Sequence, residues 1–473
     1  MTDPSLEALF SPRSVAVIGA SEGVSATGAP KMGAAALEHL IAHGFAGDIY
    51  PVNPRGGTIQ GRQAYADLQS VPGGIDLAMI VLPAESCLTA VRDCVAKGVR
   101  AAIVFGSGFS EAGNEALEAE MKAVAHEGGL RLVGPNTAGF VSMRSNLVAT
   151  ISMIGSFRPF VSGNIAFVTQ SGALGGSMLG RAMEEGVGFS HWVATGNQAD
   201  LETADYLDYL IDQPEVEAIA LFLEGVGDAE KFLAAARKAE QAAKPIVVYK
   251  AGRSEVAAQA VASHTGALAG SDRIFDGICR QYGLVRVDDV SELFSTALTL
   301  SWLKGKLPHG TNIGIVSASG GICGVAADEC EAFGLDVPEL PQATQDKMRD
   351  FTPAFAALRN PVDVTGQIRS FPTGYQDVVR TVAGDESIDA LLLLITMAAE
   401  PRSSFYGREI PAIADETDEP VFVSWVGPVS MAHIGFPMLG AGKVPNFLTV
   451  RQAIKAIRHA VDYRSFLSRQ EGT

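Results

Sequence analysis

The chain has 473 residues, of which 47% are hydrophobic and 19% are charged, and its formal net charge at pH 7 is −17. A chain of this length is expected to form about two to four globular domains. Its acidity argues against binding to nucleic acid, because contacts with phosphate backbones need a basic face.

The sequence also bears on compartment and metal content. No basic stretch followed by an apolar one opens the chain, and its longest apolar runs are too short to span a bilayer, so we expect neither a signal peptide nor a membrane partner. Its five cysteines form no CxxC pair and no metal-ligand spacing. They predict reduced, buried thiols, a cytoplasmic location and no metal site.

In the first block of the chain, short apolar runs alternate with longer amphipathic ones, which is typical of a buried parallel sheet with crossover helices. Helices are predicted at about 33–43, 85–97 and 114–126. Strands are predicted at 14–19, 48–52, 76–82, 101–105 and 131–133. This pattern predicts a complete doubly wound α/β domain over residues 1–146.

Two further α/β blocks follow, and each opens with a strand, a small polar residue, a glycine and a helix. The second block has predicted strands at 163–170, 189–193, 218–223 and 245–249. The third has predicted strands at 312–317, 390–396 and 420–424 and ends in a basic helix at 450–468. We therefore predict a second domain over 147–306 and a third over 307–473.

The ends of the first two predicted strands carry a candidate cofactor site. The turn Gly19-Ala20-Ser21 continues through Lys31 to Gly33, and its glycines would let backbone N–H groups approach a phosphate at a helix N-terminus. The second strand ends in Pro51-Val52-Asn53-Pro54-Arg55, without the acidic residue of an NAD site. Arg55 suits a ribose phosphate, which coenzyme A and NADP both carry. A structural turn and a solvated charge are the alternatives.

Two more segments follow strands on the same predicted edge: Pro83 after the third strand and Gly134-Pro135-Asn136-Thr137-Ala138-Gly139 after the fifth. Ligands of open α/β sheets collect at the carboxyl ends of the strands. We therefore expect both segments to line the cofactor site, with plain turns as the alternative.

Two helix-opening turns are candidate anion sites: Ser171-Gly172-Ala173 and Ser319-Gly320-Gly321. Each offers backbone N–H groups without intrahelical partners, the positive end of a helix dipole and a hydroxyl. Ordinary helix capping by serine is the alternative.

His264 and Glu224 are the candidate catalytic pair. His264 lies among small residues in the run 261–270, so a phosphoryl group could reach its ring. Glu224 follows an apolar strand, where its carboxylate would accept a hydrogen bond from one imidazole nitrogen and make the other more nucleophilic. A packing histidine and an ordinary strand-end acid are the alternatives.

Together these motifs resemble the nucleoside-diphosphate-forming acyl-CoA synthetases, the superfamily of succinyl-CoA synthetase, and most closely the α subunits of ADP-forming acetate–CoA ligases. The matching segments are GAS at 19–21, YPVNP at 50–54, GPNTAG at 134–139, QSGALG at 170–175, EG at 224–225, SHTGALAG at 263–270 and NPVDVTG at 360–366.

The resemblance implies an acid–thiol ligase with a Rossmann-like CoA-binding domain and two flavodoxin-like domains. It implies that His264 is phosphorylated during turnover, that Glu224 orients it, and that the turns at Ser171-Gly172-Ala173 and Ser319-Gly320-Gly321 hold the phosphate. The residues expected to contact coenzyme A are Gly19, Ser21, Lys31, Asn53, Arg55, Pro83, Asn136 and Thr137.

The resemblance also implies a partner. No segment up to Thr473 resembles an ATP-grasp nucleotide-binding module, so we expect a separate β subunit that holds ADP or ATP with Mg²⁺, in a hetero-oligomer or in a homodimer of this chain. Two other functions stay open at this point: an NADP-dependent oxidoreductase and a non-catalytic acyl-CoA-binding regulatory protein. The sequence identifies neither the carboxylic acid nor the choice between ADP and GDP.

Overall fold

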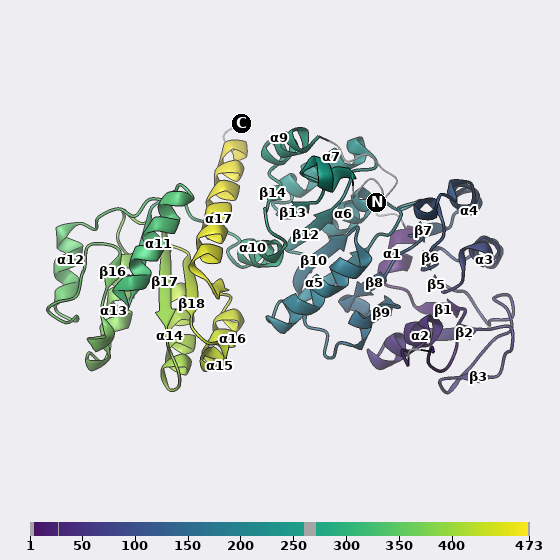
Figure 1. The fold of residues 1–473 in the computed structure, drawn as a ribbon, viewed down its shortest axis with the longest axis horizontal. Coiled ribbons are helices and arrows are strands. Elements are labelled where there is room, and N and C mark those ends of the chain that lie inside the picture. The colour runs from purple at the N-terminus through teal and green to yellow at the C-terminus, as the bar shows by residue number, and fades with distance from the viewer. Residues whose placement is uncertain (1–3, 27, 260–270, 472–473) are drawn as a thin grey trace. The chain divides into compact units, whose positions relative to one another are not determined.

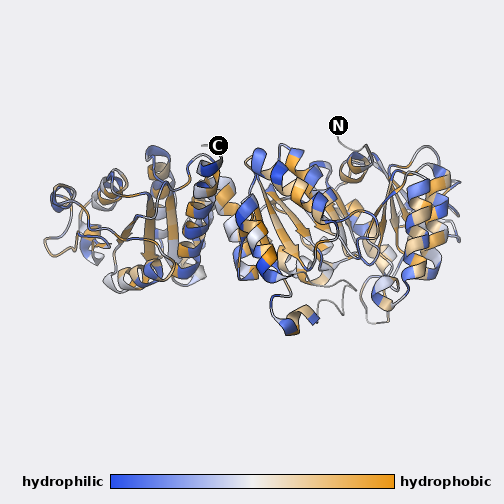
Figure 2. Ribbon diagram, turned by 90° about the horizontal axis from the view of Figure 1, so that it is seen from above, coloured by the Kyte–Doolittle hydropathy of each residue, from blue (hydrophilic) through white to orange (hydrophobic). Residues whose placement is uncertain are grey.

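The computed structural model describes residues 4–26, 28–259 and 271–471, and the chain forms two compact units, residues 1–290 and 291–473 (Figure 1). Each unit is an α/β structure built on parallel sheets, which confirms the predicted fold class. Figure 2 shows the reason: the sheet strands are mainly apolar, while the helices around them carry both apolar and polar faces. None of the helices among the described residues is long and apolar enough to cross a membrane.

The first sheet of the N-terminal unit has five parallel strands in the order β2-β1-β5-β6-β7. Counted along the chain, this is the strand order 2-1-3-4-5, in which β1 lies inside the sheet, and it is an order of doubly wound domains. The strands are β1 (Ser14–Ile18), β2 (Asp48–Val52), β5 (Leu77–Ile80), β6 (Ala101–Val104) and β7 (Arg131–Val133), and the remaining elements are α1 (Pro4–Phe10), α2 (Met32–Ala42), α3 (Ala84–Lys97), α4 (Glu115–Glu127), η1 (Ser110–Ala112) and the small hairpin β3 (Thr58–Ile59) and β4 (Arg62–Gln63).

The second sheet of this unit has seven strands in the order β14-β13-β12-β10-β11-β8-β9. Its strands are β8 (Gly139–Ser142), β9 (Leu147–Thr150), β10 (Ser162–Thr169), β11 (Phe189–Ala194), β12 (Ala218–Leu223), β13 (Ile246–Lys250) and β14 (Val285–Arg286), and its helices are α5 (Gly172–Glu184), α6 (Thr203–Asp212), α7 (Ala229–Gln241), α9 (Asp272–Tyr282), η2 (Met143–Ser145) and η3 (Met153–Ser156). Strands β8 and β9 run antiparallel and were not predicted from the sequence.

Helix α1, which leads into the first sheet, packs on elements of the second sheet. The ring of Phe10 stacks on Tyr209 of α6 with a centroid separation of 4.1 Å and meets Phe140 of β8 edge-on at 4.7 Å. The hydroxyl of Tyr209 donates to the carboxylate of Glu7 at 2.7 Å. Buried aromatic pairs of this kind stabilise a core beyond the apolar area that they bury.

The C-terminal unit has one parallel sheet in the order β16-β15-β17-β18-β19. Its strands are β15 (Ile313–Ser317), β16 (Val362–Asp363), β17 (Ala390–Thr396), β18 (Val421–Val426) and β19 (Asn446–Phe447). Its helices are α10 (Val290–Trp302), α11 (Gly320–Ala332), α12 (Gln342–Arg349), α13 (Gly374–Ala383), α14 (Arg402–Glu416), α15 (Val429–Ala432), α16 (Gly435–Ala441), α17 (Val450–Glu471) and η4 (Gly366–Ser370). The predicted basic C-terminal helix corresponds to α17.

Candidate active site

The carboxyl edge of the first sheet gathers the residues predicted to bind coenzyme A. Because its strands are parallel, Gly19 after β1, Asn53 after β2, Pro83 after β5 and Asn136 after β7 all lie at one edge. The structure therefore brings together residues that are up to 117 positions apart in the chain.

The turn between β1 and α2 is built for close approach. Gly19 has a φ of +91°, and a Cβ built on it would lie 2.3 Å from the carbonyl oxygen of Val81. A Cβ on Gly33, in the first turn of α2, would lie 2.1 Å from the Gly19 oxygen and 3.1 Å from Oγ of Ser21. Both positions therefore need glycine, and Lys31, the N-cap of α2, is exposed at the same turn.

Asn53 links the first two strand ends. Its side-chain amide donates to the carbonyl oxygen of Ala20 at 2.8 Å, and its Oδ1 accepts from the backbone N–H of Arg55 at 2.9 Å. Asn53 thus shapes the edge through internal hydrogen bonds, while the side chain of Arg55 is exposed.

The loop after β7 joins the first sheet to the second. Thr137 is 4% exposed, and its hydroxyl donates to the carbonyl oxygen of Ala194 at the end of β11 and accepts from the N–H of Gly139 at 3.0 Å. The side-chain amide of Asn136 donates to Oδ1 of Asn197 at 3.2 Å. The loop predicted to bind the cofactor is therefore fixed on the second sheet.

A polar cluster holds Asn197 beneath that loop. Its side-chain amide donates to the carboxylates of Glu111 at 2.5 Å and Glu118 at 2.9 Å and lies 3.2 Å from Oγ of Ser110. Burial opposes ionisation of Glu111, but hydrogen bonds from Asn197 and from nearby backbone N–H groups hold the pKa of this carboxyl below its usual value. Asn197 is therefore held by two carboxylates and can orient the side chain of Asn136.

The first anion turn opens α5 directly beside this loop. A Cβ built on Gly172 would lie 2.9 Å from the Cβ of Ala138, so the two segments touch. Ser171 precedes the helix, and no side-chain cap bond from it reaches the described first turn. Its N–H instead donates to Oγ1 of Thr169 at 3.1 Å, and Ala173 is exposed. The hydroxyl and the first helical N–H groups are thus placed to meet an anion.

Glu224 lies next to the same turn. It follows β12, is 8% exposed, and its backbone N–H donates to Oε1 of Gln170, which also accepts from the N–H of Gly225 at 2.9 Å. The Gln170 amide nitrogen donates back to the Gly225 oxygen at 2.8 Å. One glutamine side chain therefore joins the strand end that carries Glu224 to the turn that begins at Ser171.

His264 lies within 260–270, outside the described residues. The positions that flank this segment are described. Before it, the ammonium of Lys250 donates to the carbonyl oxygens of Glu224 and Ala251, both at 2.7 Å. After it, Asp272 begins α9 and pairs with the guanidinium of Arg286 at 2.5 Å.

The second anion turn belongs to the C-terminal unit. Ser319 caps α11 with no side-chain bond to the described first turn, and its N–H donates to Oγ of Ser317 at 3.2 Å. A Cβ on Gly320 would lie 2.8 Å from a carboxylate oxygen of Asp363, whereas one on Gly321 would meet open space. This turn therefore resembles the first in geometry but has a carboxylate beside it.

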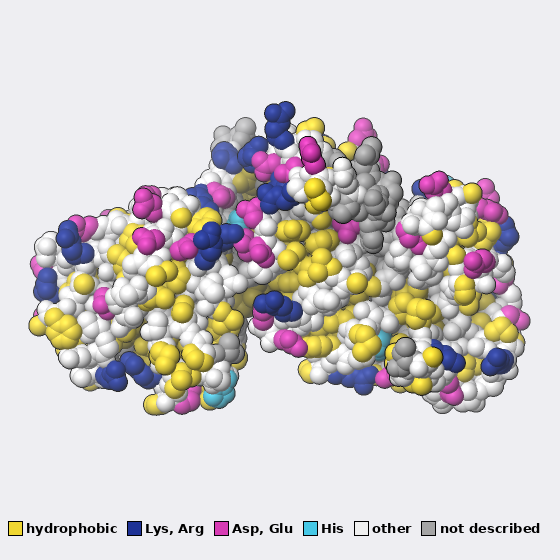
Figure 3. Space-filling model, in the orientation of Figure 1, with side chains coloured by type: hydrophobic (Ala, Val, Ile, Leu, Met, Phe, Trp, Pro, Cys, Tyr) yellow, Lys and Arg dark blue, Asp and Glu magenta, His cyan; other side chains and the backbone are white. Residues whose placement is uncertain are grey.

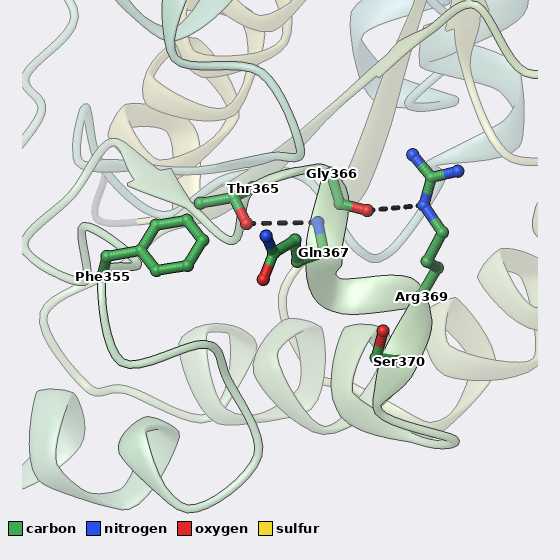
Figure 4. Close-up of a pocket in the computed structure, with 6 residues that line it drawn as sticks. All are labelled: Phe355, Thr365, Gly366, Gln367, Arg369 and Ser370. Atoms are coloured by element: carbon green, nitrogen blue, oxygen red, sulfur yellow. Dashed lines mark hydrogen bonds between the residues drawn. The ribbon is translucent and has the colours of Figure 1, made fainter.

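A shallow pocket of about 350 Å³ lies in the same unit, around the segment after β16. Figure 4 shows the ring of Phe355 and the guanidinium of Arg369 on opposite sides of the pocket. The N–H of Gln367 donates to the hydroxyl of Thr365 at 3.3 Å, and Nε of Arg369 donates to the Gly366 oxygen at 2.7 Å. Because these polar groups bond locally and do not converge, the pocket suggests no particular ligand.

On the face drawn in Figure 3, basic side chains are interspersed with acidic ones. No cluster of three or more potential metal ligands occurs among the residues that the structure describes. The five cysteines are free and buried, and burial raises the thiol pKa of Cys94 to about 12.

Sequence reasoning missed the roles of Gln170, Lys250 and Asn197. Gln170 stands directly before the predicted turn, and Lys250 ends an apolar strand, which is an unusual place for a lysine. Asn197 gives no comparable signal, because its partners lie far away in the chain.

Three family models match the chain. A CoA binding domain matches residues 13–143, a succinyl-CoA ligase like flavodoxin domain matches 162–300, and a Ligase-CoA domain matches 313–434.

Curated proteins and solved structures give the same picture. The chain is 35% identical to the α subunit of ADP-forming acetate–CoA ligase I of Pyrococcus furiosus, with 96% of each chain covered. It is 37% identical to ADP-forming acetate–CoA ligase I of Archaeoglobus fulgidus, covering 84% of this chain and 55% of that protein. An acetyl-coenzyme A synthetase of Candidatus Korarchaeum cryptofilum, solved with phosphate and ADP, superimposes with a TM-score of 0.87 at 32% identity, over 99% of this chain and 98% of that one.

Proposed function

Because the chain belongs to the succinyl-CoA-ligase-like family of ADP-forming acyl-CoA synthetases, which are acid–thiol ligases, we propose that it is the α subunit of such an enzyme. It interconverts acyl-CoA, phosphate and a nucleoside diphosphate with a carboxylic acid, free CoA and a nucleoside triphosphate. The comparisons give no support to the nicotinamide or regulatory alternatives.

The observation that carries the proposed site is the contact between the two edges of the N-terminal unit. The loop 134–139, predicted to hold coenzyme A, touches Gly172 of the first anion turn, and Gln170 ties that turn to Glu224. A thioester held at the first edge would thus meet a phosphate held at the second, with an acid beside it. Holding the two reactants together in this way replaces a bimolecular encounter.

In the proposed reaction, an oxygen of phosphate attacks the thioester carbonyl, the carbon–sulfur bond breaks, and CoA leaves as the thiolate and takes up a proton. The acyl phosphate then gives its phosphoryl group to a ring nitrogen of His264, which releases the carboxylate. Glu224 accepts a hydrogen bond from the other ring nitrogen and so stabilises the charged ring. The N–H groups of the turns at Ser171 and Ser319 stabilise the charge on the phosphoryl oxygens.

We propose that ADP or ATP, with Mg²⁺, binds on a separate β subunit. The Pyrococcus relative with the same span is named a subunit α, whereas the Archaeoglobus relative is almost twice as long as the matched region. Phosphohistidine formed on this chain would then donate to the nucleotide on the partner. We also propose a cytoplasmic location, which free thiols at all five cysteines support.

The proposed reaction is tested by measuring whether a labelled phosphoryl group becomes attached to His264. Incubation with the β subunit and ATP labelled in the γ-phosphate should give acid-labile, base-stable label, and His264→Ala should abolish it. Calorimetry should show that His264→Ala binds CoA with an affinity close to that of the wild type and that neither protein binds NADP. Loss of both labelling and CoA binding would instead mark His264 as structural, and an unlabelled wild type would refute the proposed reaction.

A further inference from the structure

Lys250 is a buried lysine that the proposed reaction does not yet use. It is the last residue of β13, is 4% exposed, and donates its ammonium protons to the carbonyl oxygens of Glu224 and Ala251, both at 2.7 Å. Lysine is almost never fully buried, because removing an ammonium from water is costly unless it is hydrogen-bonded or paired. This buried ammonium lies at the strand end that carries Glu224.

The sheet register explains how Lys250 reaches Glu224. Strands β12 and β13 are parallel neighbours, and Leu223 is paired with Lys250. Lys250 therefore lies beside the end of β12, and its ammonium donates to the carbonyl oxygen of Glu224, the residue that follows Leu223. On the other side, Gln170 holds the N–H of Glu224. The backbone of Glu224 is thus fixed from β10 and from β13.

Charged side chains of the described residues act on the ammonium of Lys250. Burial lowers the pKa of Lys250, whereas Asp272 at the start of α9 and Glu224 raise it and Arg286 of β14 lowers it. Arg286 is engaged with Asp272 at 2.5 Å and with Asp276 at 3.6 Å. Interaction between charges is mutual, so an ammonium that is stabilised by Glu224 also stabilises the ionised carboxylate of Glu224.

We propose that Lys250 is a positioning residue for phosphoryl transfer: its ammonium fixes the backbone of Glu224 and keeps that carboxylate ionised, ready to accept a hydrogen bond from His264. This inference rests on the proposed function, because it gives Glu224 the task of orienting the histidine. A purely structural role would need only a side chain that fills the space, since apolar replacements of buried charges are often tolerated well.

The matched experiment compares Lys250→Met with Lys244→Met. Lys244 lies just before β13, at the opposite end of the same strand, and its ammonium donates to the Gln213 carbonyl oxygen at 2.6 Å. Each variant removes one ammonium together with the hydrogen bonds that it donates to backbone carbonyl oxygens: two for Lys250 and one for Lys244. The rate of phosphohistidine formation is measured from pH 5 to pH 9 with the β subunit and labelled ATP, together with CoA affinity and thermal unfolding.

We expect Lys250→Met to slow labelling about 10- to 100-fold, as for other supporting residues around a reactive group. We expect the acid limb of its pH profile to move to higher pH, because Glu224 becomes easier to protonate. CoA affinity should stay within about twofold of the wild type, since the lost interaction is electrostatic and lies at the second sheet. Lys244→Met should keep the rate and the profile of the wild type.

Lys250→Gln provides a second variant if Lys250→Met does not fold, because it keeps a hydrogen-bond donor and loses only the charge; its acid limb should move in the same direction. An unchanged rate, or a slower rate with an unmoved acid limb, overturns the proposal and leaves Lys250 structural. These outcomes are distinct from failure of the proposed function, in which the wild type itself shows no label on His264.

Discussion

Replacement of Gln170 by methionine tests whether the link between the first anion turn and Glu224 is needed for the reaction. Methionine is similar in size but forms no comparable hydrogen bond, so the variant leaves the N–H groups of Glu224 and Gly225 and the Gly225 oxygen without their present partner. Each buried polar group left unsatisfied costs about 1–3 kcal/mol. Since Gly225 is partly exposed and water can replace some of these bonds, we expect a loss of about 2–4 kcal/mol in the free energy of unfolding.

The effect on the reaction should exceed that on folding. A shift of about 1 Å in a group that orients a reactant can slow a reaction about 100-fold, and Gln170→Met removes the hydrogen bond to the N–H of one such group, Glu224. Single-turnover labelling of His264, measured well below the unfolding temperature of the variant, should therefore fall by one to two orders of magnitude on that same estimate.

The control is Gln213→Met. Gln213 is 7% exposed and donates to the Tyr209 oxygen at 3.2 Å, away from the carboxyl edge. This variant should lose stability but keep the labelling rate. If Gln170→Met is destabilised as expected and still labels within twofold of the wild type, the link is structural only and our reading of the edge is wrong.

Three further outcomes are expected. Gly172→Val should slow labelling at least tenfold, because the new Cβ meets that of Ala138 at 2.9 Å and displaces the anion turn; labelling kinetics with stability as the control would check this. Asp363→Asn should tighten phosphate binding several-fold at low salt, measured by calorimetry, because a negative charge beside Gly320 is removed; weaker binding would show that the carboxylate mainly holds the loop. Burial lowers the pKa of His191 to about 4, so the folded state prefers the neutral ring: stability is full above the unfolded pKa of about 6.5 and falls as the pH drops toward 4, by about 2 kcal/mol at pH 5. His191→Gln should therefore lose less free energy of unfolding than the wild type between pH 7 and pH 5, as measured by urea denaturation.

The fold could be predicted from the sequence because its strongest signals are local. Buried parallel strands are apolar along their whole length and are separated by helices, so β1, β5, β12 and β17 stood out as short apolar runs. Strands β8 and β9 were missed because that alternation is absent around them. They are short neighbours that pair antiparallel and are separated only by the single turn η2.

The candidate site was predictable only as far as strand ends could be placed on one edge. That reasoning located Gly19, Asn53, Asn136 and Glu224 correctly at carboxyl ends, but it could not assign tasks to their side chains. The hydroxyl of Thr137, for example, is used internally between two sheets. Such contacts depend on register and on packing between segments about 60 residues apart, which no local pattern encodes.

The connection after β7 explains why the edge proposed to hold coenzyme A and the edge proposed to hold phosphate adjoin in one unit. Residues 134–139 leave the first sheet at its carboxyl end and lead directly into β8 of the second sheet. The same loop therefore belongs to both edges, and two close approaches fix it there: Ala138 against Gly172, and the Pro135 oxygen 2.2 Å from a Cβ built on Gly196. Neither glycine can take a side chain without moving the loop. Ala138 and Gly172, which the sequence analysis assigned to ligand binding, thus also allow the two edges to lie in contact.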